Sequence, residues 1–300
     1  MPYNREVRLG YLSALLAAVF FGSVSTVAKP TLESIHPLVL AFMVYFMASL
    51  VSTPFARSPL QSVKKNDWLL LLFIAVSGAV LGPSFFFLGL ETSTASDTAL
   101  LGNGEIIFSV ILAIIFFREK LRRLGVLAVG MVIVGMFIVT TDLEISESLL
   151  NPDNLGNLAI LVATAFWALD NNLSKILSKK INLVRIIQLK SAIGGAILLA
   201  VVIVLEIPLE ITLEQVPSIL FLGGAGFGLS IYLFLHGLKR IGTVRTIMLF
   251  STSSVFGMFF AFIFLNENIS MFQVLAVIIM ISGIYLLHRD DRFLKMEKLQ

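Results

Sequence analysis

Residues 155–180, LGNLAILVATAFWALDNNLSKILSKK, decide how the rest of the chain is interpreted. The stretch opens with about twenty mostly apolar residues, which is the length that crosses a bilayer, yet positions 170–172 within it read Asp-Asn-Asn. It also repeats the start of the chain, because residues 9–29, LGYLSALLAAVFFGSVSTVAK, match it at a shift of 146 positions. A polar cluster inside an apolar segment and an internal repeat are the two features from which we argue.

Composition predicts an integral membrane protein. Of the 300 residues, 57% are hydrophobic and 14% are charged, and the mean hydropathy is +0.95, whereas soluble domains carry roughly 25% charged residues. The absence of cysteine excludes disulfides and thiolate metal sites, and the three histidines are too far apart to form a metal motif. The connections between apolar segments leave no room for a soluble domain, so we expect neither a cofactor nor a nucleic-acid partner.

Ten segments are apolar enough and long enough to cross a bilayer as helices. We take the first as a retained helix and not as a signal peptide, because no cleavage site of the A-x-A type stands out. The predicted spans are Leu9–Ala28, Pro37–Phe55, Trp68–Leu90, Thr94–Phe117, Leu121–Thr141, Leu155–Leu177, Leu183–Leu205, Val216–Leu238, Val244–Leu265 and Ser270–Leu287.

The positions of Lys and Arg predict the orientation, because cytoplasmic loops are enriched in both. If the N-terminus is cytoplasmic, all of the 22 Lys and Arg residues except Lys29 and Lys190 fall in cytoplasmic segments. The outer loops carry acidic residues instead, among them Asp142 and Glu147. We therefore predict an all-α integral membrane protein with ten transmembrane helices and both termini in the cytoplasm.

The internal repeat continues along the whole chain. At a shift of 148 positions Gly78 matches Gly226, and Glu119 matches Glu267. Each half, 1–148 and 149–300, then contains five predicted spans, and because five is odd the halves have opposite orientations in the membrane. Such a 5+5 inverted repeat in one integrated membrane domain is typical of secondary transporters, whose site lies near the midplane between the halves.

Several short motifs point to a family. Residues 89–121, GLETSTASDTALLGNGEIIFSVILAIIFFREKL, combine the small residues 94–96 with a close at Phe117-Arg118-Glu119, and Leu265-Asn266-Glu267 repeats that close in the second half. Trp167-Ala168 falls where an F-W-A motif is common. In these features the chain resembles the EamA family of the drug/metabolite transporter superfamily.

This resemblance implies export or exchange of small metabolites by alternating access. It also implies which spans line the pathway, namely 9–28, 68–90, 94–117, 155–177, 216–238 and 244–265. Many members carry a proline in the middle of the spans that match 94–117 and 244–265. Here Ile106 and Ser254 stand at those positions, so a proline kink is not expected.

Ionisable residues within a membrane are costly and usually face the bundle interior. Asp170 and Lys190 each lie about seven residues from the same end of adjacent spans, so both are roughly 10 Å deep and can pair. The pair is either structural or part of a substrate or proton site. Asn171 and Asn172 could satisfy it in either case by hydrogen bonds across helices.

Glu105 lies near the middle of the span 94–117 with no cation at a matching depth. It is therefore a candidate for proton coupling or for binding a substrate amine, the alternative being a protonated Glu bonded to helix backbone. Residues at helical spacing place it on one face, and we expect that face to oppose the matching face of 244–265. The two faces are Thr98, Gly102, Glu105 and Ser109, and Thr246, Phe250, Ser253 and Gly257.

Other features are open to two interpretations. The glycine-rich runs 78–82 and 223–228 fit tight packing or a flexing point. Lys29 and its repeat mate Lys175 are expected to extend to the lipid headgroups. Trp167 is expected to need a partner for its indole N–H. The full set of candidate pathway residues is Asn103, Glu105, Ser109, Trp167, Asp170, Asn171, Asn172, Lys190, Tyr232, Thr246 and Ser253.

These features favour a secondary transporter in the cytoplasmic membrane. Its partners would be membrane lipid and a small organic metabolite, with amino acids or related amines as one hypothesis and proton coupling as another. No Walker A motif is present, so ATP is not the direct energy source. The alternatives are an intramembrane enzyme, for which Asp170 is the one clearly deep aspartate and no G-x-S-x-G occurs, and a receptor or scaffold, which usually has a soluble domain.

Overall fold

A computed structural model describes residues 5–56, 63–65, 67–117, 123–141, 152–241, 246 and 249–297. Every regular element in these ranges is helical. In the first half they are α1 (Arg5–Thr31), α2 (Pro37–Ser52) with the short 3-10 turn η1 (Thr53–Phe55), α3 (Asp67–Ala75), η3 (Val76–Leu81), α4 (Gly82–Thr92), α5 (Ala95–Leu101), α6 (Gly104–Phe117) and α7 (Arg123–Thr141). In the second half they are α8 (Pro152–Leu177), α9 (Leu183–Val204), α10 (Val216–Leu220), η4 (Phe221–Leu229), α11 (Ser230–Ile241), α13 (Ser253–Leu265) and α14 (Met271–Glu297).

Six helical stretches within the described ranges are long and apolar enough to cross a membrane. They are Arg5–Thr31, Pro37–Phe55, Asp67–Thr92, Arg123–Thr140, Leu183–Val204 and Val216–Gly237. Ser253–Leu265 and Met271–Leu286 are apolar but shorter. The described part of the chain is therefore all-helical and has several helices suited to a membrane, and the number of ten spans remains a prediction.

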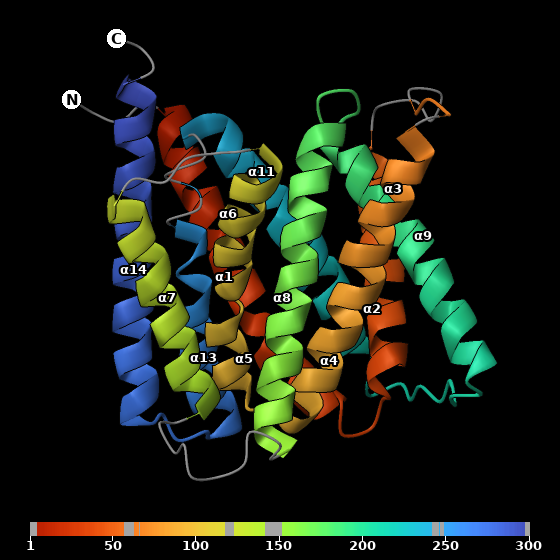
Figure 1. Cartoon of the computed structure of the whole chain (residues 1–300). Coiled ribbons are helices and arrows are strands. Elements are labelled where there is room, and N and C mark those ends of the chain that lie inside the picture. Colours follow the sequence, from red (N-terminus) through yellow and green to blue (C-terminus); the bar gives the residue numbers. More distant parts are fainter. Residues whose placement is uncertain are drawn as a thin grey trace.

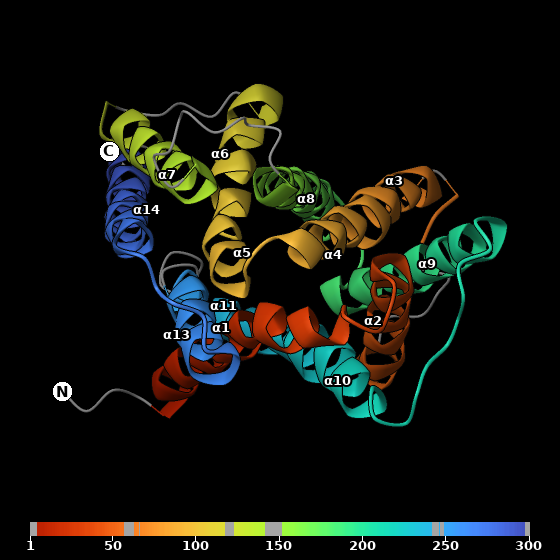
Figure 2. The same cartoon turned by 90° about the horizontal axis from the view of Figure 1, so that it is seen from below.

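The helices run roughly along one axis (Figure 1). α1 begins and α14 ends at what we call the upper end, the top of Figure 1, and the opposite end is the lower end. Viewed along the axis, α7 and α14 lie together at one edge, and α2 and α9 lie together at another (Figure 2). Between these edges α1 packs on α11 and α13, and α4 packs on α8.

Glycines bring α7 and α14 close together. Gly135 on α7 faces Met280, and Gly283 on α14 faces the Ala128 carbonyl oxygen at 2.8 Å from where a Cβ would stand. Helices in lipid gain most from such close packing, because lipid tails are as apolar as the side chains they replace. The contact joins the first half of the chain to the second.

The predicted span 94–117 is not one helix. α5 ends at Leu101, Gly102 and Asn103 form a turn, and α6 begins at Gly104. The matching part of the second half also has a turn, at 251–252, directly before α13. The Asn103 side-chain amide donates to Ser254 Oγ (2.9 Å) and is buried. The two interruptions are thus joined to each other, and neither contains a proline.

The glycine-rich runs form π-helix, in η3 and in η4. In η3 the Gly82 N–H donates to the Ser77 carbonyl, five residues back. The same five-residue spacing would pair the N–H of residue 83 with the Gly78 carbonyl. Residue 83 is a proline and has no N–H, so this bond cannot form. The Tyr45 hydroxyl on α2 donates to the Gly78 carbonyl instead (2.8 Å). The proline thus accounts for one unpaired carbonyl, and a neighbouring helix satisfies it.

Candidate functional site

One face of α8 combines accessibility with polar side chains. Val162 and Asn171 are both exposed. They are nine positions apart, which is about two and a half helical turns, so they lie on opposite sides of α8. α8 packs against α4 through Trp167, which lies where a Gly82 side chain would stand, and against α6 through Thr164, which lies beside Gly104. Asn171 therefore faces the bundle interior, opposite Val162, and its exposure shows accessible space there.

Asn171 is bound to Glu105. Its side-chain amide donates to Glu105 Oε1, across from α8 to the first turn of α6. From the sequence we predicted no cation at the depth of Glu105. The partner that Glu105 does have, the amide of Asn171, was not predicted. The Asn172 side-chain amide donates to two backbone carbonyls. One is that of Ser109 on α6 (3.3 Å), and the other is that of Ala168 on its own helix, α8 (2.9 Å). Both asparagines thus bind α6 or their own helix, and the prediction that they satisfy the ion pair is wrong.

The predicted ion pair between Asp170 and Lys190 is present. Lys190 on α9 donates to Asp170 Oδ2, and the two side chains are 12% and 4% exposed. Ser174, one turn along α8, donates to the other carboxylate oxygen (2.9 Å). Gly78 in η3 lies against the Asp170 carboxylate, where any side chain would overlap it. The pair is therefore enclosed by α8, α9 and η3.

Trp167 belongs to a continuous row of rings, which we call the aromatic layer. Its ring lies 5.1 Å from Phe86 and 6.4 Å from Phe227, and Phe21 lies 6.0 Å from Phe227 and 5.2 Å from Phe250. The five rings come from α4, α8, η4, α1 and the residues before α13. The Trp167 N–H is buried and has no hydrogen-bond partner among the described residues, although one was expected. The layer lies one turn of α8 below the exposed Asn171.

The remaining candidates lie outside this cluster. Tyr232 on α11 is exposed, and its ring lies 5.5 Å from that of Phe55 at a tilted angle. Thr246 is buried and lies beside Gly237, and Ser253 is buried with its carbonyl against Gly22 of α1. Asn103 belongs to the joined helix interruptions.

The two helix faces that we expected to oppose each other meet in a different register. α5 and α13 do pack together, but the close approach is between Gly257 and Ala99. Ala99 lies beside Thr98 and outside the predicted face. The expectation of contact between the two segments is met. Gly257 belongs to the predicted face of Thr246, so that face takes part in the contact, whereas on α5 the contact residue, Ala99, lies outside the predicted face of Thr98.

Lys29 does not extend to the lipid headgroups. Its ammonium donates to three backbone carbonyls at the end of α4, those of Leu90 (2.9 Å), Glu91 (3.0 Å) and Ser93 (2.7 Å). Sequence reasoning missed this role and that of Glu267, which lies at the same end. The motif Leu265-Asn266-Glu267, which repeats Phe117-Arg118-Glu119, was the sequence signal that could have pointed to Glu267.

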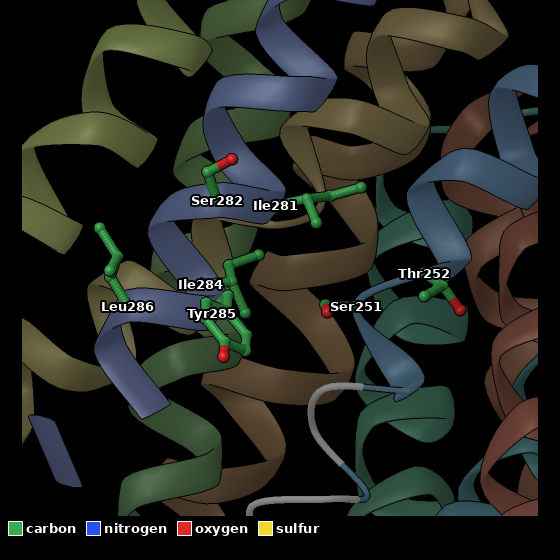
Figure 3. Close-up of a pocket in the computed structure, with 7 residues that line it drawn as sticks. All are labelled: Ser251, Thr252, Ile281, Ser282, Ile284, Tyr285 and Leu286. Carbon is green, nitrogen blue, oxygen red and sulfur yellow. The ribbon is translucent and has the colours of Figure 1, made fainter. Parts of the chain in front are cut away.

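A cavity of about 500 Å³ lies elsewhere, between α14 and the turn that precedes α13 (Figure 3). Ser251 and Thr252 line one side and α14 lines the other. No candidate pathway residue is among its lining residues, which are Ser251, Thr252, Ile281, Ser282, Ile284, Tyr285 and Leu286. The cavity is mostly apolar and separate from the Glu105–Asn171 pair.

Comparison with known proteins decides the family. The sequence profile of the EamA-like transporter family matches residues 8–141 and 154–289. The chain belongs to the EamA-like transporter family. An uncharacterized transporter of Methanothermobacter thermautotrophicus is 33% identical over 298 residues, which is 94% of this chain and 87% of that protein. An uncharacterized transporter of Archaeoglobus fulgidus is 24% identical over 92% of this chain and 95% of that protein.

Two further comparisons bear on function and fold. The riboflavin transporter ImpX of Fusobacterium nucleatum subsp. nucleatum is 26% identical over 155 residues, 49% of this chain and 51% of that protein. A solved crystal structure superposes with a TM-score of 0.68 at 15% identity, covering 95% of this chain and 98% of that one, so the two share a fold. This EamA-like protein is therefore a multi-pass membrane transporter with a small-molecule substrate.

Proposed function

We propose that this protein is a secondary transporter that exports or exchanges small organic metabolites across the cytoplasmic membrane by alternating access. Its ten spans form a 5+5 inverted repeat of residues 1–148 and 149–300, with both termini in the cytoplasm. The observation that carries the proposal is the Glu105–Asn171 pair, which lies on an accessible interior face above the aromatic layer, whose rings are buried or half-buried. It supports a site reached from the upper end and blocked toward the lower end.

The chemistry of the site favours a substrate with a cationic group, such as an amino acid or a related amine. The Glu105 carboxylate and the Asn171 amide are the polar groups at the accessible level, and a carboxylate is the natural partner of an ammonium. Glu105 is also our candidate for proton coupling. Asp170 and Lys190 already satisfy each other, which favours the structural interpretation of that pair.

Flux measurements in proteoliposomes test the proposal. Wild type and Glu105→Gln are compared over a panel of amino acids, amines and riboflavin, with and without an imposed pH gradient. We expect wild type to move at least one amino acid or amine faster with the gradient, and Glu105→Gln to lose that response while it still exchanges substrate. Glu214→Gln, at an exposed position between α9 and α10, should behave as wild type.

Two results would contradict the proposal at different points. If Glu105→Gln matches wild type in both conditions, Glu105 is not the coupling residue, and Asp170, Asn171 and Lys190 become the candidates. If no amino acid or amine exchanges, the substrate class is wrong. Riboflavin is in the panel because a protein that matches about half of this chain is named a riboflavin transporter.

A further inference from the structure

One face of α1 leads from the aromatic layer to the lower end. Phe21, Ser25 and Lys29 follow each other at intervals of four residues, so they share that face. Ser25 is 3% exposed, and its hydroxyl has no hydrogen-bond partner among the described residues. Lys29 then reaches the three carbonyls at the end of α4. A buried, unsatisfied hydroxyl therefore lies between the aromatic layer and a charged residue at the lower end.

Glu267 reaches the same place from the second half of the chain. α13 ends at Leu265, and Asn266 adopts a left-handed conformation (φ 55°), which Asn tolerates better than most residues at a helix end. This turn directs Glu267 toward α5. Its two carboxylate oxygens accept hydrogen bonds from the Ala95 N–H (2.8 Å) and the Ser96 N–H (2.9 Å), and the Ser96 hydroxyl donates as well (2.6 Å).

Lys29 and Glu267 therefore hold the two sides of one short connection. α4 ends in free carbonyls, which carry partial negative charge, and α5 begins with free N–H groups, which carry partial positive charge. The ammonium satisfies the first and the carboxylate satisfies the second. Hydrogen bonds with one charged partner are about twice as strong as neutral ones. We call this arrangement, Lys29 and Glu267 with residues 90–96, the lower-end clamp.

We propose that Lys29 and Glu267 are the gate residues of the lower end, and that the clamp must break each time the transport pathway opens there. The clamp joins α1, the α4–α5 connection and α13, so it ties the first half of the chain to the second directly below Ser25. Backbone groups in a membrane protein cannot be left without partners, so the clamp opens only as water enters to replace its bonds. The proposal rests on the proposed alternating access.

The absence of cysteine makes the test simple. Ser25→Cys reports on the space below the aromatic layer, and Lys175→Cys reports on the accessible face of α8 above it. Each is made in the otherwise wild-type chain and in Glu267→Gln, and labelling by a water-soluble maleimide is timed on the purified protein. We expect Ser25→Cys to be labelled roughly tenfold faster with Glu267→Gln, because loss of a charge-assisted hydrogen bond shifts a two-state equilibrium by about that factor.

Lys175→Cys separates the clamp from alternating access. If its labelling slows as that of Ser25→Cys accelerates, both proposals are supported. If the labelling rate of Lys175→Cys does not change while that of Ser25→Cys rises, the clamp is a gate, but the proposed reciprocal closure of the upper end is wrong. If Ser25→Cys is labelled at the same slow rate with and without Glu267→Gln, the clamp proposal is overturned whatever the other reporter does.

Milder variants guard against a general loss of folding. Ser96→Ala removes one donor of the clamp and should accelerate labelling of Ser25→Cys less than Glu267→Gln does. Lys29→Arg keeps the charge, so Ser25→Cys should still be labelled slowly in that background. Lys29→Met removes the charge, so Ser25→Cys should be labelled fast there. Glu214→Gln, at an exposed position outside the clamp, should have no effect. Acceleration by Glu214→Gln as large as that by Glu267→Gln would overturn the assignment.

Discussion

Gly78 shows how a single residue can fix the position of a charged group. Its Cα lies so close to Asp170 that a Cβ would overlap the carboxylate oxygen Oδ2 and would stand 2.7 Å from the Asp170 Cβ. Neither neighbour can move freely, because Asp170 is held by Lys190 and Ser174 and Gly78 is held by the Tyr45 hydroxyl. The site has no space for any residue but glycine.

We therefore expect Gly78→Ala to lower the free energy of unfolding by about 1–3 kcal/mol, the usual cost of overpacking. Chemical or thermal unfolding in detergent, followed by tryptophan fluorescence, measures it. Gly130→Ala is the matched control, because no atom lies within 4 Å of its added methyl group and alanine in a helix gains up to about 1 kcal/mol over glycine. Equal stability of the two variants would contradict the overlap.

At this scale the sequence predicted one contact of the site and missed the other. Asp170 and Lys190 could be paired because depth along a helix follows from residue number. The Glu105–Asn171 bond also requires knowing how α6 and α8 are rotated about their axes. The sequence specifies that rotation only weakly, because in these mostly apolar segments most lipid-facing and core-facing side chains are of the same kind. Lys29 was misread for the same reason.

Among the elements, the π segment η3 depends on two residues from different helices. Pro83 leaves the Gly78 carbonyl without its backbone donor, and Tyr45 supplies a hydroxyl in its place. Tyr45→Phe should therefore lower the free energy of unfolding by about 1–3 kcal/mol, the cost of an unsatisfied buried acceptor.

In Pro83→Ala the same Tyr45→Phe change should cost less, because residue 83 then has an N–H to donate. Unfolding of the two single variants and the double variant measures this coupling. Additive losses would mean that the Tyr45 hydroxyl and Pro83 act independently. The explanation of η3 would then be wrong.

The ends of elements were predicted better than their interruptions. Most predicted spans coincide with helices within a few residues at either end, as for α1 and α9, because charged and proline-rich connections stand out against apolar runs. The turn at Gly102–Asn103 was missed although Asn103-Gly104 is a turn signal, because the segment has no proline and was taken as one continuous span. It is stabilised by the Asn103–Ser254 bond, a partner 151 residues away that local sequence cannot reveal.

The whole molecule has one orientation to test. If the ten-span prediction holds, Ser34 and Ser178 face opposite sides of the membrane. Both are exposed in connections at opposite ends of the bundle. In cells, we expect an impermeant maleimide to label Ser34→Cys directly and Ser178→Cys only after permeabilisation. Labelling of both from the same side would overturn the predicted topology, and the reverse pattern would overturn the assignment of the cytoplasmic side.

The pairing of α7 with α14 has a consequence for how the protein is made. α7 ends at Thr141, but its partner begins at Met271, so most of the second half must leave the ribosome before the glycine face of α7 is covered. Domains are generally assembled from the N-terminus during synthesis, and here a helix of the second half, α14, completes the packing of the first half. A nascent chain that stops short of α14 therefore leaves the glycine face of α7 uncovered in the membrane.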